Sequence, residues 1–214
     1  MTGEIQIWRA SLAIDKATEL RLRETLSDDE RERADGFQFD RDRRRFIAAR
    51  GMLRELLGHR LDRAPERIRF RVGPHGKPSL VDDELRFSVS HSGELALFAI
   101  CPDGEIGIDL EEVRPIAHRD RIVERYFTAE EWKACRDESG DRRFFRCWTR
   151  KEAWLKARGE GLTGPVEEQP SDDERWVVRP VEAAAGFVAA LAEERGAFPR
   201  SIAYRQWSHG VDAH

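Results

Sequence analysis

Three carboxylates lie within four positions of the segment IGIDLEEV, residues 106–113: Asp109, Glu111 and Glu112. Apolar residues alternate with the first two acids, a pattern typical of a strand. Residues two apart on a strand share a side and lie roughly 6.6–7 Å apart, so Asp109 and Glu111 share a face that Glu112 does not. Two such carboxylates could converge on Mg²⁺, which prefers oxygen ligands at about 2.0–2.1 Å. The alternative is a solvated strand end, and this motif alone does not decide between them.

A second chemical stretch is FFRCWTRKEAWLKARGEGL, residues 144–162. On a helix its aromatic residues form one apolar stripe, and Glu152 and Lys156, four residues apart, flank that stripe. A surface ion pair is one interpretation. Against it, a carboxylate beside an aromatic stripe would be partly desolvated and would require a cation. Glu152 is therefore expected to lie beside a positive charge of some kind.

Basic side chains stand at three other places in the chain. His91 follows a strand pattern and lies between two serines, where it could be structural or could bind a phosphate. Lys77 is presented by the turn PHGKP. The arginine-rich segment 41–54 is either the solvated face of a helix or a nucleic-acid patch, but Phe46 is its only aromatic stacking residue.

The elements that must position these residues follow from hydrophobic periodicity and capping signals. The patterns predict strands at 4–10, 67–72, 85–92, 94–100 and 106–112, and helices from Asp28, over 40–61, near 118–125, 129–136 and 141–158. The tail is ambiguous: residues 181–195 have helical propensity, yet three short runs could equally be strands. The turn CPDGE at 101–105 divides the chain into two halves that each run strand, helices, strands. This predicts a duplicated unit with halves at 1–104 and 105–214.

The composition limits the function classes. The chain has 214 residues, 40% of them hydrophobic, and its 36% charged residues nearly cancel to a net charge of −4, which argues against a global field that attracts nucleic acid. Three widely spaced cysteines, Cys101, Cys135 and Cys147, suggest no zinc or redox motif and fit a reducing cytosol. The N-terminus lacks the pattern of a signal peptide, and the longest apolar runs are too short to span a bilayer. These features predict a soluble cytoplasmic protein.

Five motifs in a fixed order carry a family resemblance: GKPSL, FSVSHS, GIDLEEV, FTAEEW and WTRKEAWLKARGEGL. The set resembles the 4′-phosphopantetheinyl transferases, specifically the monomeric surfactin-synthetase-activating type, over about residues 27–162. The form WTRKEA is similar to the branch with Trp and Ala around the Lys-Glu pair. The resemblance implies an α+β fold of two similar halves related by a pseudo-twofold, with coenzyme A in the cleft between them. It also favours strands for the tail.

The same resemblance implies roles for individual residues. Asp109, Glu111 and Glu152 would bind Mg²⁺, and Glu152 would also be the candidate base. Lys156 would contact the phosphate next to the bond being broken and stabilise or protonate the departing group, with Lys151 near the same anionic site. The 3′-phosphate and adenine-nucleotide end of coenzyme A would be bound in the 1–104 half by a larger set: Arg33, Arg45, Lys77, Pro78, Ser90 and His91. Two positions depart from the family, since Glu30 replaces a basic residue and Ser88 an Asn.

The implied reaction is transfer of 4′-phosphopantetheine from coenzyme A to a serine of an apo carrier protein, with release of adenosine 3′,5′-bisphosphate. The carrier could belong to fatty-acid, polyketide or nonribosomal-peptide synthesis, and neither a nucleic acid nor a membrane is expected as a partner. Carriers are usually acidic, so 119–125 or 142–146 is the expected docking face. Two alternatives remain at this point: a Mg²⁺-dependent hydrolase of coenzyme A, and a non-enzymatic module that binds a carrier or nucleic acid through residues 41–50.

Overall fold

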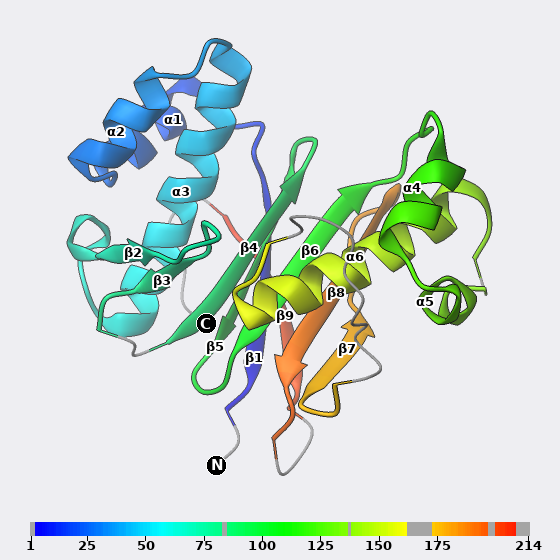
Figure 1. The fold of residues 1–214 in the computed structure, drawn as a ribbon. Coiled ribbons are helices and arrows are strands. Elements are labelled where there is room, and N and C mark those ends of the chain that lie inside the picture. The colour runs from blue at the N-terminus through cyan, green and yellow to red at the C-terminus, as the bar shows by residue number, and fades with distance from the viewer. Residues whose placement is uncertain (1–2, 83–84, 137, 162–172, 197–199, 209–214) are drawn as a thin grey trace.

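The computed structural model of the chain describes residues 3–82, 85–136, 138–161, 173–196 and 200–208 (Figure 1). The described helices and strands confirm the predicted α+β class. In chain order they are β1 Ile5–Ser11, α1 Lys16–Glu24, α2 Asp28–Asp35, α3 Asp40–Leu61, the 3₁₀ helix η1 Pro65–Arg67, β2 Phe70–Val72, β3 Pro78–Leu80, β4 Arg86–Ser92, β5 Leu95–Cys101, β6 Ile106–Glu112, α4 Arg119–Tyr126, α5 Ala129–Ala134, α6 Gly140–Arg158, β7 Trp176–Pro180, β8 Phe187–Glu194 and β9 Ile202–Gln206.

The described strands form a four-stranded sheet of order β4-β5-β1-β9, a three-stranded sheet of order β6-β8-β7 and the β2-β3 hairpin. β1 is antiparallel to β5 and parallel to β9, so the last strand completes the sheet that the first one opens. Figure 1 shows α1, α2 and α3 on one side of β4, and α6 lying across β6 and β8. β4 and β6, the edge strands of the two larger sheets, run side by side at the centre.

Local capping signals fixed several helix ends. Ser27 and Glu30 form the expected capping box at the start of α2, and Thr128 and Glu131 form another at α5. The hydrophobic pattern does not predict α1. A capping signal for this helix is nevertheless present in the sequence: Asp15 is its N-cap and accepts a hydrogen bond of 2.7 Å from the Thr18 amide. β2 is also shorter than predicted, since 67–69 do not join the strand.

The tail forms strands, as the resemblance favoured. β8 lies between β6 and β7 and is buried on both faces over most of its length. Ala190 and Ala192 pack against α6, whereas Ala189 and Leu191 face the core below. Burial between two neighbouring strands therefore overrides the helical propensity of these alanines.

No described helix combines the length with the apolar run that a membrane span requires. The longest described helix, α3 with 22 residues, carries acids and arginines in its first two turns. Its buried residues instead pack on the four-stranded sheet, with Leu53, Leu57 and Phe87 in one core cluster.

Gly107 sets how closely α6 approaches the sheet. A Cβ at Gly107 would lie 2.0 Å from the Ala153 carbonyl oxygen and 2.4 Å from the Ala157 amide nitrogen. The helix backbone therefore rests directly on β6 at this residue. Glu152 and Lys156 directly precede Ala153 and Ala157, so this contact places them close to Asp109, which is the next same-facing position of the strand after Gly107.

Gly107→Ala should lower the free energy of unfolding by about 1–3 kcal/mol or more, because α6 must shift to admit the methyl group. Denaturant unfolding measures the change. The matched control is Gly36→Ala, where the nearest atom to an added Cβ lies 3.5 Å away, and its effect should stay within about 0.5 kcal/mol. Equal stability of the Gly107→Ala variant and the wild type would contradict direct backbone contact.

Candidate active site

A pocket of about 390 Å³ opens between β4, β6 and α6, and six of the predicted residues line it. Asp109 and Glu111 come from β6, and Glu152 and Lys156 from α6. Its remaining lining residues are Val89, Ser90, His91 and Trp148. We call this the acid pocket. Glu112 is exposed and is not among its lining residues, as the strand parity predicted.

Asp109 is the most buried acid of the pocket. Its Oδ1 accepts hydrogen bonds from Lys156 Nζ at 2.6 Å and from Ser90 Oγ at 2.9 Å. Its Oδ2 is also buried, yet no described residue donates a hydrogen bond to it. Leaving a buried carboxylate oxygen without a partner is unfavourable, so this atom fits a cation that the protein itself does not supply.

The two other acids also respond to the crowding of negative charge. Burial, and then the charge of Asp109, raise the pKa of Glu152, and Glu111 adds to the effect. Burial likewise raises the pKa of Glu111, with Asp109 contributing in the same direction and a hydrogen bond from Ser92 opposing it. The charged forms of all three acids would be stabilised by one shared cation.

The three carboxylates share a pocket without forming a closed cage. Among the described residues, no three His, Cys, Asp or Glu side chains are already gathered closely enough to ligate one ion. The ammonium group of Lys156 instead neutralises one oxygen of Asp109. The donor set is all oxygen and mostly charged, which suits a hard ion such as Mg²⁺.

A second pocket, of about 550 Å³, lies between α2, α3 and β4, and we call it the basic pocket. It brings together Arg33, Arg45, Pro78 and His91 as predicted, and its other lining residues include Phe37, Phe46, Arg50 and Ser92. The Arg33 guanidinium lies 5.1 Å from the centre of the Phe46 ring, and Arg45 pairs with Glu94.

Arg50 is a basic residue that the sequence analysis did not single out. It lies one helical turn after Phe46, and this spacing was the available signal. Glu30, which departs from the family pattern, is buried and pairs with Arg50 at 3.4 Å and Arg54 at 2.6 Å. It therefore anchors arginines of α3 rather than facing a ligand.

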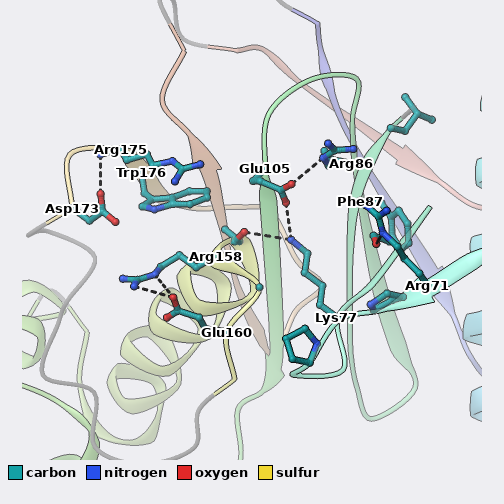
Figure 2. A pocket seen from close by; sticks show the side chains of 17 residues that line it. Arg71, Lys77, Arg86, Phe87, Glu105, Arg158, Glu160, Asp173, Arg175 and Trp176 are labelled. Atoms are coloured by element: carbon teal, nitrogen blue, oxygen red, sulfur yellow. Dashed lines mark hydrogen bonds and ion pairs between the residues drawn. The ribbon is translucent and has the colours of Figure 1, made fainter. Parts of the chain in front are cut away.

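Lys77 does not join Arg45 and His91. It lines an adjoining pocket of about 620 Å³, which shares Pro78 with the basic pocket. Figure 2 shows its ammonium group directed at Glu105. Lys77 Nζ lies 3.1 Å from Glu105 Oε2 and 3.2 Å from the Ile106 carbonyl oxygen, and Arg86 Nε lies 2.9 Å from Glu105 Oε1. In this structure the Lys77 ammonium group therefore lies apart from Arg45 and His91.

Lys151 also lies away from the acid pocket. Its ammonium group is buried and donates to the Tyr126 carbonyl oxygen at 2.6 Å and to Glu131 Oε2 at 3.0 Å. Consecutive residues of a helix point about 100° apart, so Lys151 and Glu152 face different neighbours. Lys151 ties α6 to α5, which corrects its expected place beside the anionic site.

Comparisons with known proteins agree with this architecture. A model of the 4′-phosphopantetheinyl transferase superfamily matches residues 105–203, and a model of the 4′-phosphopantetheinyl transferase N-terminal region matches residues 15–103. The chain is 41% identical over 169 residues to 4′-phosphopantetheinyl transferase HetI of Nostoc sp., covering 76% of this chain and 71% of HetI. It therefore belongs to the 4′-phosphopantetheinyl transferase superfamily, a family of transferase enzymes.

Two Bacillus relatives extend this comparison. The chain is 27% identical over 201 residues to 4′-phosphopantetheinyl transferase ffp of Bacillus subtilis, which covers 85% of this chain and 88% of the relative. It is 32% identical over 146 residues to 4′-phosphopantetheinyl transferase psf-1 of Bacillus pumilus, covering 66% and 61% respectively. Transferases of this family move 4′-phosphopantetheine from coenzyme A to carrier proteins. The family predicted from the five motifs is confirmed.

Proposed function

We propose that the chain transfers 4′-phosphopantetheine from coenzyme A to a serine of an apo carrier protein in a Mg²⁺-dependent reaction that releases adenosine 3′,5′-bisphosphate. One observation carries the Mg²⁺ assignment: the buried Asp109 Oδ2 has no donor among the described residues and lies in a pocket lined by two more carboxylates. Asp109, Glu111 and Glu152 would hold the ion. When bound, it would neutralise charge on the pyrophosphate oxygens.

The side chains of the acid pocket would handle the charge and the proton of the reaction. The carrier serine oxygen forms a bond to the β-phosphorus, and the bond from that phosphorus to the bridging oxygen of adenosine 3′,5′-bisphosphate breaks. Glu152 would accept the serine proton, and burial favours this role because it raises the pKa of that carboxyl. Lys156 would stabilise the negative charge that develops on the departing phosphate.

The basic pocket would bind the nucleotide end of coenzyme A. Its volume is within the range of small-molecule sites, and Arg33, Arg45 and His91 supply groups that bind phosphate. Ser90 and Pro78 line the space near them. Lys77 and Lys151 have no part in this proposal because their ammonium groups are directed elsewhere.

The wider organisation follows from the same proposal. Residues 1–104 would form the nucleotide-binding half and residues 105–214 the half with the metal ligands and the catalytic helix. The segment WTRKEA on α6 supports assignment to the surfactin-synthetase-activating branch. We place the enzyme in the cytoplasm as a monomer that acts on an acyl, peptidyl or aryl carrier domain.

Mass spectrometry of several apo carriers mixed with coenzyme A, Mg²⁺ and the chain tests the proposal. At least one carrier should gain the mass of phosphopantetheine, with adenosine 3′,5′-bisphosphate as the second product. Omitting Mg²⁺ and adding a chelator should stop the reaction. Release of free phosphopantetheine without a change in carrier mass would instead identify a hydrolase.

Binding of adenosine 3′,5′-bisphosphate should take up a proton at His91. Desolvation by the pocket walls, and then the charges of Lys156 and Arg45, lower the pKa of His91, so the free imidazole is neutral near pH 7. A bound phosphate favours the charged imidazole and raises that pKa. Affinity should therefore increase as the pH falls from about 8 to about 6.5, by at most tenfold per pH unit for one proton.

Calorimetry in two buffers of different ionisation enthalpy measures this proton uptake. His91→Gln should bind the bisphosphate more weakly and lose the uptake, while titration of the ligand's own phosphate remains as a common background. If the variant takes up as many protons as the wild type, another group is responsible.

Glu112→Ala should leave the rate of carrier modification within about twofold of the wild type, because Glu112 is exposed at the end of β6. Glu111→Ala, one residue away on the opposite face, should lose most activity. Initial rates at saturating coenzyme A compare the two variants. A large loss in the Glu112 variant would contradict the strand-parity assignment of the ligands.

A further inference from the structure

Three serines of β4 face the edge of β6. Ser88, Ser90 and Ser92 occupy alternate positions of the strand, and all three are buried. Each hydroxyl oxygen accepts a hydrogen bond from an alternate backbone amide of β6: Ser88 from Ile108 at 3.0 Å, Ser90 from Leu110 at 3.2 Å and Ser92 from Glu112 at 3.1 Å. We call these three residues the serine row.

The serine row takes the place of a backbone ladder. Among the described strands, β4 ends the four-stranded sheet and β6 ends the three-stranded sheet, and neither pairs with the other through its backbone. Buried amides at such an edge require acceptors. Side-chain oxygens supply them here. The serine side chains therefore lie between β4 and β6 and join the two sheets. The acid pocket opens along this junction.

Two members of the row also donate to the proposed metal ligands. Ser90 Oγ donates to Asp109 Oδ1 and Ser92 Oγ donates to Glu111 Oε2, each at 2.9 Å. A hydroxyl has one donor and two acceptor positions. Ser90 fills all three because it also accepts from Lys156 Nζ at 3.2 Å.

The register repeats along the row. Ser90 contacts the amide of Leu110 and the carboxylate of the residue before it, and Ser92 contacts Glu112 and Glu111 in the same manner. For Ser88 the residue in the carboxylate position is Gly107, which has no side chain. Ser88 therefore joins the sheets without orienting an acid, which makes it a built-in comparison for the other two.

We propose that Ser90 and Ser92 are positioning residues, which use the junction between the two sheets to aim the carboxylates of Asp109 and Glu111 at a shared cation. The part that concerns the cation rests on the proposed function. Partners that orient metal ligands typically change metal affinity by about 10–100-fold when removed. The serine row thereby links the packing of the two halves to the geometry of the acid pocket.

Mn²⁺ binding to the full chain, followed by the electron paramagnetic resonance signal of the free ion, tests the positioning role. Ser92→Ala should weaken Mn²⁺ binding by about tenfold or more. Ser88→Ala removes the same atoms and should stay within about twofold of the wild type. Ser92→Thr keeps the hydroxyl on a residue suited to strands and should restore most of the affinity. Ser90 is a poorer test because it also contacts Lys156.

Amide hydrogen exchange tests the junction without any metal. Ser92→Ala should speed exchange at the Glu112 amide, and Ser88→Ala at the Ile108 amide, with little effect at the other position. Unchanged exchange in both variants would contradict the hydrogen bonds between the serine hydroxyls and the β6 amides. Exchange as expected, with equal Mn²⁺ affinity in the two alanine variants, would overturn the positioning role. A wild-type chain that binds no Mn²⁺ would contradict the metal assignment, and with it the positioning role. The exchange experiment would still show whether the serine hydroxyls join β4 to β6.

Discussion

Asp109→Ala should abolish carrier modification and leave the chain folded. Asp109 combines burial, an oxygen without a described donor and a central place between Glu111, Glu152 and Lys156. Losing a ligand itself should exceed the 10–100-fold effect typical of losing its supporting partner, so the rate should fall by at least about 100-fold. The mass-spectrometric assay measures this loss at saturating coenzyme A.

The stability of the same variant separates a functional from a structural role. Removing Asp109 leaves Lys156 without that partner, but Lys156 is part-exposed and can turn to water, while Glu111 and Glu152 lose a repelling neighbour. In metal-free buffer the free energy of unfolding should therefore change by less than about 1 kcal/mol. Added Mg²⁺ should stabilise the wild type and not the variant. Near-normal turnover by the variant would refute the metal assignment.

Lys156→Ala should lose turnover while largely retaining affinity for coenzyme A. Its ammonium group lies in the acid pocket, 2.6 Å from Asp109 Oδ1, whereas Arg33 and Arg45 line the basic pocket. A charge directed at the departing phosphate stabilises the transition state more than the bound substrate. Loss of one such group typically lowers the turnover number by about 10²–10³-fold.

Calorimetry with coenzyme A and single-turnover kinetics distinguish the two possible roles of Lys156. The dissociation constant should change by no more than about threefold, which corresponds to less than 1 kcal/mol. Lys156→Arg is the control, since it keeps the charge with a different geometry and should recover part of the rate. If affinity collapses while bound coenzyme A reacts at the normal rate, Lys156 is a binding residue.

Many helices and strands, and the face of β6 on which each acid lies, could be predicted because they depend on residues that are neighbours in the sequence. The alternation of 106–112 was sufficient to separate Asp109 and Glu111 from Glu112. Ser27 with Glu30 and Thr128 with Glu131 marked two helix starts, and Gly159 ends α6 in the left-handed conformation that glycine favours. α1 was not predicted, because its apolar face is short and Asp15 is its only N-cap signal.

The partners of long charged side chains could not be predicted in this way. Lys151 and Glu152 are adjacent in sequence, yet one is buried against Glu131 and the other lines the acid pocket. Lys77 reaches Glu105 across the junction between the halves. A flexible ammonium group binds whichever acceptor the fold brings near, and the sequence does not state that distance.

The sequence by itself thus determined which strand and which helix carry the acids, and which face of the strand they share, since these follow from periods of 2 and 3.6 residues. Only the tertiary structure decided that the acids of the strand and of the helix line one pocket. Gly107 lets α6 rest on β6 so that Glu152 and Lys156 approach Asp109. The serine row closes two sheet edges with side-chain hydroxyls, and its bonds span about twenty residues of chain, beyond the reach of any local pattern.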